Sequence, residues 1–512
     1  MRQLWQRKSF ADCESDLAER GGLKRTLNKW HLTALGVGAT IGAGVFATTG
    51  TAIVGEAGRP GAGPAIVLSF LLTAVACGFA ALCYAEFASM VPVAGSAYTY
   101  SYASLGELVA WIIGWVLIIE YAVGNIGVAI SWSGYFREFV SHLGIHIPAW
   151  LATDYRSAFA ALREVEAGAT DAGTLYLASA VAEAPRLAGV PFIANVPAFA
   201  SVALLTVVLV RGVQESANWN NAMVALKVGI ILFFVAVGAF LVHPGNWTDP
   251  VQGGFMPNGW AGVGAGAAII FFSYIGFDAV STAAEETKDP GRDMPFGIIM
   301  SLVVCTVLYV VIALVMTGMT SWKNLGTAEP IITALQFADG PAWLLNASRF
   351  IISFAAVMAM GSVLLVFQMG QPRIFMSMAR DGLLPGWIAK VHPRFRTPHV
   401  GTILTGIVVA IPASFANISE IVELTNIGTL FAFVLVCVGV LVVRRTDPDR
   451  PRPFRVPAAP WTPLISIVAC LYLMLQLPTR TWVWFGAWLL VGLVVYFLYG
   501  YRHSRLRQRR AA

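Results

Sequence analysis

The sequence predicts an all-α membrane protein with about twelve transmembrane helices. Of its 512 residues, 57% are hydrophobic and only 12% are charged, whereas an ordinary soluble domain has about 25% charged residues. Long stretches lack charge altogether, for example residues 297–320 and 400–417. Because a helix needs about 20 apolar residues to cross the hydrocarbon core of a bilayer, this distribution excludes a soluble fold.

The expected spans are the apolar stretches between polar segments. They lie at residues 33–55, 64–90, 105–135, 194–211, 219–242, 260–284, 296–319, 343–370, 400–416, 420–443, 461–478 and 482–500. The first 30 residues are polar and contain no apolar core, so we expect no cleaved signal peptide. Five of the six cysteines fall in the spans; they show no metal-ligand spacing and are expected to be buried there.

Lysine and arginine are distributed unevenly over the predicted loops. With twelve spans, the two tails and alternate loops share one side, which carries 25 of the 34 Lys and Arg residues. Cationic loops stay in the cytoplasm during membrane insertion, so we expect a cell-membrane protein with both termini cytoplasmic. The net charge of +6 then reflects topology and contact with anionic lipid rather than nucleic acid binding. Region 137–193 is expected outside the cell, with a short amphipathic helix or loop near the surface.

Two predicted spans are rich in glycine. Residues 36–44 of the first span contain four glycines, and residues 262–266 of the sixth contain three, followed by Gly276 and Asp278. Glycine weakens a helix interior, and glycine-interrupted spans at corresponding positions in two halves indicate a transporter binding site. Unwinding exposes backbone groups that must find partners in the membrane. An amino acid could supply them through its carboxylate and ammonium groups; close packing of helices through small residues is the alternative.

Several short motifs together resemble the amino acid–polyamine–organocation superfamily, and within it the chain is similar to bacterial members of the cationic amino acid transporter family. The resemblance covers about residues 25–500. The motifs are IGAGVF at 41–46, YAEF at 84–87, PVAGSAY at 92–98, IGFD at 275–278 with the glutamates at 285 and 286, GQPR at 370–373 and MARDGLLP at 378–385 after the eighth span, and RVP at 455–457.

The resemblance implies a five-plus-five inverted repeat (LeuT-like) with two extra helices, working by alternating access. The implied division is a cytoplasmic N-terminal tail (1–32), a first five-helix repeat (33–243) with an extracellular insertion (137–193), a second repeat (260–443), helices 11 and 12 (444–500) and a basic cytoplasmic tail (501–512).

The resemblance also implies a substrate site at the two glycine-rich stretches. The substrate carboxylate would bind the amides of Gly42, Ala43 and Gly44. Its ammonium would bind the carbonyls of Ile41, Phe272 and Ile275, next to Gly276. Phe272 falls where related carriers have an aromatic gate, and ordinary packing is the alternative. Tyr274 and Asp278 are expected to support the site.

Ionisable residues inside spans are costly and therefore suggest function. In related proton-coupled carriers a lysine in the fifth helix replaces sodium, so we expect Lys227 to carry the coupling proton; a lysine that snorkels to the headgroups is the alternative. Glu120 is expected to share in proton coupling or substrate binding, through Lys227 or a cationic substrate side chain. A purely structural role is the alternative for Glu120.

The expected function is a secondary active transporter for amino acids, coupled to protons, with exchange or uniport as alternatives. A channel is disfavoured because no repeated filter loops are visible, and an enzyme because no histidine cluster or nucleophile–base pair is visible. We expect no cofactor and no metal, with H+ as coupling ion. The expected partners are an amino acid substrate, either cationic or small and neutral, and the lipid bilayer. The sequence carries no signal for oligomeric state or for a small accessory membrane subunit.

Overall fold

A computed structural model describes residues 6–8, 25–56, 58–90, 96–169, 172–212, 217–395 and 397–511. Within this part, nine helices are long and apolar enough to cross a membrane. Three shorter apolar helices, Val196–Arg211, His399–Phe415 and Trp461–Leu475, lie at the remaining predicted spans. The prediction of an all-α, multi-pass membrane protein is therefore confirmed. Residues 92–95 of the quoted motifs lie outside the described residues.

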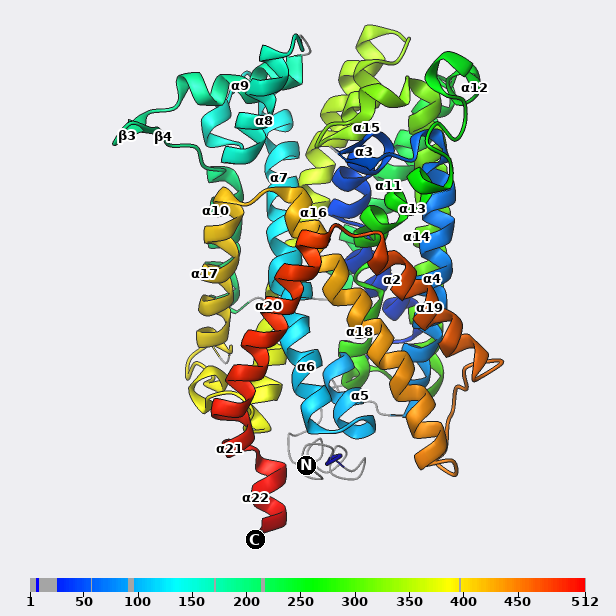
Figure 1. The fold of residues 1–512 in the computed structure, drawn as a ribbon, viewed down its shortest axis with the longest axis vertical. Helices are drawn as coiled ribbons and strands as arrows, with labels where there is room; N and C mark the ends of the chain where they lie inside the picture. Colours follow the sequence, from blue (N-terminus) through cyan, green and yellow to red (C-terminus); the bar gives the residue numbers. More distant parts are fainter. Residues whose placement is uncertain are drawn as a thin grey trace.

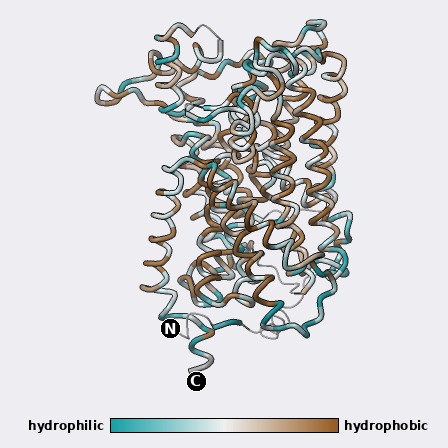
Figure 2. Tube along the Cα trace, turned by 45° about the vertical axis from the view of Figure 1, so that its right-hand side comes forward, coloured by the Kyte–Doolittle hydropathy of each residue, from teal (hydrophilic) through white to brown (hydrophobic). Residues whose placement is uncertain are grey.

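The helices form an upright bundle with irregular segments at both ends (Figure 1). Figure 2 shows hydrophobic residues along the middle of the bundle and hydrophilic residues gathered towards its two ends. This arrangement follows from the bilayer, where a helix satisfies all its own backbone hydrogen bonds while its side chains face lipid.

The first half of the chain runs from the N-terminal tail to the fifth span. Its elements are α2 (Lys29–Thr40), η2 (Gly44–Thr48), α3 (Thr49–Val54), β1 (Gly55–Glu56), β2 (Arg59–Pro60), η3 (Gly63–Ala65), α4 (Ile66–Met90), α5 (Ser96–Ser104), α6 (Glu107–Ile118), η4 (Ile119–Val123), α7 (Gly124–Ser141), η5 (Ala149–Leu151), α8 (Tyr155–Glu166), α9 (Ala172–Glu183), β3 (Arg186–Leu187), β4 (Val190–Pro191), α10 (Val196–Arg211) and α11 (Ala217–Ala239). Strands β1 and β2, and strands β3 and β4, form two short antiparallel hairpins.

The second half continues from the fifth span to the C-terminal tail. Its elements are α12 (Gly245–Thr248), η6 (Pro250–Gln252), α13 (Gly259–Ile270), η7 (Phe271–Tyr274), η8 (Phe277–Glu286), α14 (Pro290–Met319), η9 (Trp322–Leu325), α15 (Pro330–Gln336), α16 (Ala342–Arg380), η10 (Gly386–Ala389), α17 (His399–Phe415), α18 (Ile418–Thr446), α19 (Trp461–Leu475), α20 (Thr479–Val495), η11 (Tyr496–Gly500), α21 (Tyr501–His503) and α22 (Arg505–Ala511).

Helix α16 continues ten residues beyond the predicted end of the eighth span at residue 370. The motif at 370–373, which the sequence analysis assigned to the following loop, is therefore helical, with Pro372 inside the helix. The physical reason is that the buried face of α16 continues past residue 370. Gln371, Ile374 and Met378 are buried at helical spacing, so this last part of α16 still packs against the bundle.

The region between the third and fourth spans contains two helices, α8 and α9, rather than the single short helix expected there. They pack on each other around a small core of their own, separate from the core of the bundle. This core contains Ala149, Ala158, Ala180, Ala184 and Ile193. The side chain of Asp154 caps α8 by accepting a hydrogen bond from the Ser157 amide at 3.0 Å.

The described parts of both tails meet at one end of the bundle, which we call the terminal side. Lys8 Nζ donates to Asp381 Oδ1 at 2.9 Å, and the Arg505 amide donates to the Asp381 carbonyl at 3.0 Å. Both tails therefore contact the segment that follows α16. They lie at the same end of the bundle, as expected for a chain with an even number of spans. We call the other end, which carries α8 and α9, the far side.

A buried ion pair joins α4 to α18 near the terminal side. The Glu86 carboxylate, almost fully buried, accepts hydrogen bonds from Arg444 Nε at 3.0 Å and Nη2 at 2.5 Å. It also accepts one from the Val456 amide at 2.7 Å. The motif at 455–457 thus has a structural reason, because its backbone completes the coordination of a buried carboxylate.

We expect Glu86→Ala to lower the free energy of unfolding by about 1–3 kcal/mol, because it leaves the buried Val456 amide without an acceptor and removes the carboxylate from the half-buried Arg444. The exposed Asp449→Ala in the same loop is the matched control and should change stability by at most about 0.5 kcal/mol. Thermal unfolding of the purified protein in detergent measures both. Equal melting temperatures for the two variants would contradict this account of the pair.

Candidate functional site at two interrupted helices

The first span is broken in its middle. Helix α2 ends at Thr40, and Ile41 takes an extended conformation with φ −74° and ψ 100°. The chain then resumes as the π-helix η2, and the Phe46 amide reaches the Gly42 carbonyl only at 3.4 Å. The first turn of a helix leaves its amides without intrahelical acceptors. The break lies where the glycine pattern predicts, and the amides of Gly42, Ala43 and Gly44 stand at the start of the resumed helix.

The sixth span is broken at the matching glycine. Helix α13 passes into the 3-10 helix η7, after which Ile275 is extended with ψ 132°. Gly276 has φ +123°, a conformation that only glycine adopts readily. A Cβ atom there would lie 2.8 Å from the carbonyl of Ala39. Gly276 therefore provides both the backbone turn and the close approach to the first span.

The two breaks lie directly against each other. A Cβ atom on Gly44 would lie 2.3 Å from the Ser273 Cα. The hydroxyl oxygens of Thr40 and Ser273 are buried there without a hydrogen-bond partner. Buried polar atoms in native proteins normally have a partner, often a water or a ligand. Polar groups from both interrupted spans are therefore concentrated at one place inside the bundle.

Tyrosines from other spans bind the carbonyl groups next to the first break. Tyr309 donates its hydroxyl to the Thr40 carbonyl at 3.1 Å, and Tyr135 donates to the Phe46 carbonyl at 2.6 Å. The sequence analysis missed both residues, because a tyrosine inside an apolar span looks like ordinary core. The Tyr274 hydroxyl donates to the Phe70 carbonyl at 3.0 Å, so it ties the sixth span to α4.

Lys227 of α11 reaches the first break from the side. Its side chain is fully buried, and Nζ donates to the Gly38 carbonyl. Gly38 lies in the last turn of α2, where carbonyl groups lack intrahelical donors and the helix dipole favours a cation. This position argues against a lysine that snorkels to the membrane surface.

The side chains of Glu120 and Asp278 lie close to each other beside the second break. The side chain of Glu120 interacts with Asp278 and Thr429, and Asp278 Oδ1 accepts a hydrogen bond from the Gly276 amide at 3.3 Å. Glu120 lies in the π-helix η4 within the third span, an irregularity that often marks functional sites. The second oxygens of both carboxyl groups, Glu120 Oε2 and Asp278 Oδ2, are buried without a donor.

The surroundings of the breaks are mostly apolar. Phe272 is buried, and its ring lies 3.5 Å from the position of a Cβ atom on Gly127. Val363 approaches Gly42 in the same way at 3.0 Å, and Phe367 approaches Gly124 at 3.6 Å. Spans three and eight therefore form part of the wall around the breaks; the sequence placed Glu120 of span three at the site but no residue of span eight.

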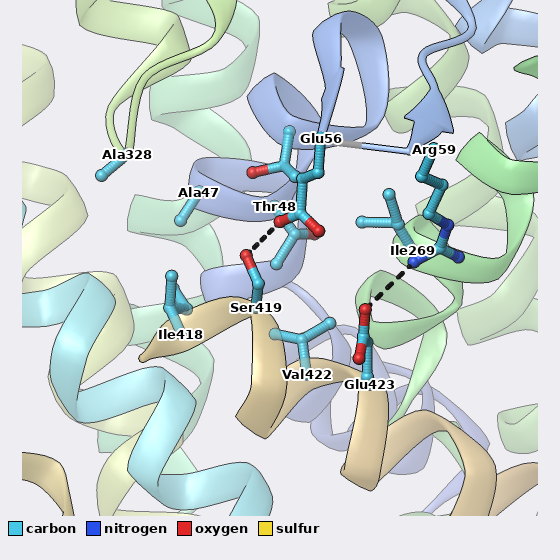
Figure 3. Close-up of a pocket in the computed structure, with 11 residues that line it drawn as sticks. Ala47, Thr48, Glu56, Arg59, Ile269, Ala328, Ile418, Ser419, Val422 and Glu423 are labelled. Atoms are coloured by element: carbon cyan, nitrogen blue, oxygen red, sulfur yellow. Dashed lines mark hydrogen bonds and ion pairs between the residues drawn. The ribbon is translucent and has the colours of Figure 1, made fainter. Parts of the chain in front are cut away.

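A small cavity of about 30 Å³ lies on the far side of the breaks, beside Thr48 (Figure 3). This space holds roughly two water molecules. Arg59 Nη1 pairs with Glu423 Oε1 at 3.4 Å, and Ser419 donates to Glu56. Burial lowers the pKa of Arg59, while the Glu423 carboxylate opposes that shift. These polar contacts join the loop after the first span to α18 across the far side.

Comparison with known proteins gives consistent matches over nearly the whole chain. A family model described as amino acid permease matches residues 27–498. The chain is 44% identical to a branched-chain amino acid permease of Bacillus subtilis (strain 168), over 99% of both chains. It is 42% identical to a methylthioribose transporter of the same organism, over 98% of this chain and 99% of that one. It is 35% identical to the vacuolar cationic amino acid transporter 4 of Arabidopsis thaliana, over 83% of this chain and 64% of that protein.

We expect Gly44→Ala to destabilise the protein by about 1–3 kcal/mol, because the added methyl group overlaps the backbone of the second break. Gly78→Ala is the matched control, since its Cβ atom would meet only Leu302 Cδ2 at 3.8 Å. Thermal unfolding in detergent measures both variants. If Gly44→Ala proves as stable as Gly78→Ala, the two breaks do not pack as described.

Proposed function

Because the chain belongs to the amino acid permease family, we propose that it is a proton-coupled symporter for neutral, branched aliphatic amino acids that works by alternating access. The observation that carries this proposal is the pair of interrupted helices in direct contact inside the bundle. The resemblance to the amino acid–polyamine–organocation superfamily is confirmed by the family match, and members of the family are transporters, not enzymes.

The backbone at the first break suits the two charged ends of an amino acid. Nearby carbonyl groups at Gly38, Thr40 and Phe46 already accept hydrogen bonds from side chains. The amides of Gly42 and Gly44 open the resumed helix, where the dipole favours an anion. We therefore assign the substrate carboxylate to these amides. The ammonium group is assigned to the carbonyls of Ile41, Phe272 and Ile275.

The substrate side chain is proposed to be aliphatic, because the wall around the breaks is apolar. Val363, Phe367 and Phe272 approach the glycines of the first and third spans. The nearby carboxyl groups, Glu120 and Asp278, interact with each other. The negative charge of this pair is already bound by a shared proton and by the Gly276 amide, so a cationic side chain would find no free counter-charge, and an unpaired buried charge costs several kcal/mol. The similarity to a branched-chain amino acid permease supports the same substrate class.

Lys227 is the proposed carrier of the coupling proton. The hydrogen bond to the Gly38 carbonyl favours the charged form of the lysine, whereas burial disfavours it. Whether Lys227 keeps its proton therefore depends on whether the first break holds that carbonyl in place. When protonated, Lys227 holds α2 through Gly38. When it releases the proton, the contact weakens and α2 is freer to move. Proton release and helix movement are thereby linked through one hydrogen bond.

The pair formed by Glu120 and Asp278 is a second place for a proton. We propose that these two carboxyl groups, buried close together, share a proton, because two charges there would repel each other. Asp278 also binds the amide of Gly276, which connects the protonation of the pair to the geometry of the second break. Exchange or uniport by the same fold remains the alternative if neither group couples to transport.

For the topology, we propose a cell-membrane location with both tails cytoplasmic, so that the far side faces outwards. The uneven distribution of lysine and arginine supports this orientation. We also retain the division into repeats at 33–243 and 260–443 as a prediction. It is supported by the breaks, which fall in the first span of each repeat.

We expect purified protein in liposomes to accumulate labelled leucine when a proton gradient is directed inwards. Leucine should be preferred over lysine by at least about 100-fold, because an unpaired ammonium in an apolar site costs several kcal/mol. Methylthioribose should be tested beside leucine and lysine, because the relative with 42% identity is a methylthioribose transporter. A preference for lysine would overturn the proposed substrate class, and leucine exchange without gradient-driven accumulation would overturn the coupling.

We expect Lys227→Ala and Lys227→Arg to lose uphill uptake. An alanine has no group that binds a proton, and an arginine stays protonated at every pH at which the protein is folded. Internal leucine should then rise no higher than the external concentration under an inward proton gradient. Lys227→Arg tests coupling separately from charge, since it keeps a cation near Gly38. Substrate-induced thermal stabilisation serves as the control for binding. Undiminished uphill uptake by either variant would contradict the role assigned to Lys227.

A further inference from the structure

The β3–β4 hairpin on the far side presents two exposed apolar side chains together. Leu187 and Val190 are direct cross-strand partners, so their side chains lie on one face of the hairpin. Leu187 is 68% exposed and Val190 is 56% exposed. The other paired positions, Arg186 and Pro191, lie on the opposite face. The hairpin is therefore amphipathic, with an apolar face that the described part of the chain leaves uncovered.

The turn of this hairpin holds the two apolar residues close together. Ala188 and Gly189 both have positive φ values, 50° and 83°, as in the two-residue turns that suit the twist of antiparallel strands. The base is closed by the Phe192 amide, which donates to the Pro185 carbonyl at 2.9 Å. The hairpin is thus a defined structure rather than an extended loop.

The hairpin is fixed at the far-side end of a wall of lipid-facing helices. The Asn195 amide donates to the Ser414 carbonyl near the end of α17 at 2.8 Å, and α10 begins at the next residue. Helices α10 and α17 pack on each other, and both expose apolar side chains outwards, such as Leu204 and Ile407. In both views of the molecule the hairpin projects outwards beyond the bundle (Figures 1 and 2).

The helices of this wall are short for a bilayer. Helix α10 has 16 residues and α17 has 17, which correspond to about 24 and 26 Å. The hydrocarbon core is about 30 Å thick. On the terminal side α10 ends with Arg211 and α17 begins with His399, so polar residues fix that end. The length by which α10 and α17 fall short of the hydrocarbon core is therefore at their far-side ends, where the hairpin projects.

We propose that the β3–β4 hairpin is a membrane-interface anchor, with Leu187 and Val190 entering the acyl boundary of the far-side leaflet and Arg186 facing its phosphate groups. The partner is the lipid surface itself. Apolar side chains next to a cation suit this boundary, because the side chains leave water while the guanidinium stays among the headgroups. The hairpin then completes the apolar band above α10 and α17 and reduces the hydrophobic mismatch there.

The test uses single-cysteine positions in the full chain. Among the described residues the native cysteines are buried, and Cys13 is replaced by serine. Leu187→Cys and Val190→Cys are compared with Arg186→Cys on the other face of the hairpin and with Glu164→Cys, an exposed position on α8. Leu204→Cys on α10 provides the lipid-facing reference. The rate of reaction with a water-soluble maleimide is measured in phospholipid nanodiscs that hold one copy of the protein.

We expect the cysteines at 187 and 190 to react about tenfold more slowly than the cysteine at 164, because burying a leucine-sized side chain is favoured by at least that factor. The cysteine at 186 should react as fast as the one at 164. Equal rates at 164, 187 and 190 would overturn the proposal. Protection that appears only in crowded liposomes, and not in single-copy nanodiscs, would also overturn it by assigning the hairpin to a second copy of the chain.

Discussion

Backbone groups that lose their helical partners in the middle of a membrane must find others, and much of this structure depends on that constraint. At the first break the carbonyls of Gly38, Thr40 and Phe46 receive hydrogen bonds from Lys227, Tyr309 and Tyr135. These side chains come from α11, α14 and α7, so three further spans hold the interruption in place. The amides that open the resumed helix are donors, and in the proposed site the substrate carboxylate is their acceptor. The asymmetry gives the break a polarity suited to a zwitterion.

The two ends of the bundle are closed by different interactions. On the far side, Arg59 and Glu423 connect the loop after the first span to α18. On the terminal side, Asp381 joins both tails through Lys8 and the Arg505 amide. Under the proposed alternating access, each of these contacts would open in turn as packed elements move against each other. The Arg59–Glu423 pair is itself mostly buried, so it could open at low cost only if water entered to replace the lost partners.

Bilayer thickness bears on the helices at the edge of the bundle as well. The wall formed by α10 and α17 is shorter than the spans that surround the breaks, and the segment between α7 and α10 lies at its far-side end. That segment has a small core of its own, so it can hold a hairpin in a fixed position without support from the bundle interior. A peripheral insertion of this kind can adjust the fit between protein and bilayer while leaving the breaks unchanged.

The sequence by itself determined the membrane class, the position of the spans and the two broken segments. These features depend on local composition, because apolar length decides which segments enter a bilayer and glycine decides where a helix opens most easily. The prediction failed for α16, where GQPR looked like a loop while Gln371, Ile374 and Met378 continued a buried helical face.

Only the tertiary structure decided which side chains complete the breaks. Tyr135 and Tyr309 look like ordinary core residues in the sequence, and their hydroxyls acquire a role only when folding brings them to the carbonyls of Phe46 and Thr40. The contact of Glu120 with Asp278 is equally non-local. The physical reason is that local composition fixes where backbone groups are freed, whereas the packing of distant spans fixes which partners they meet.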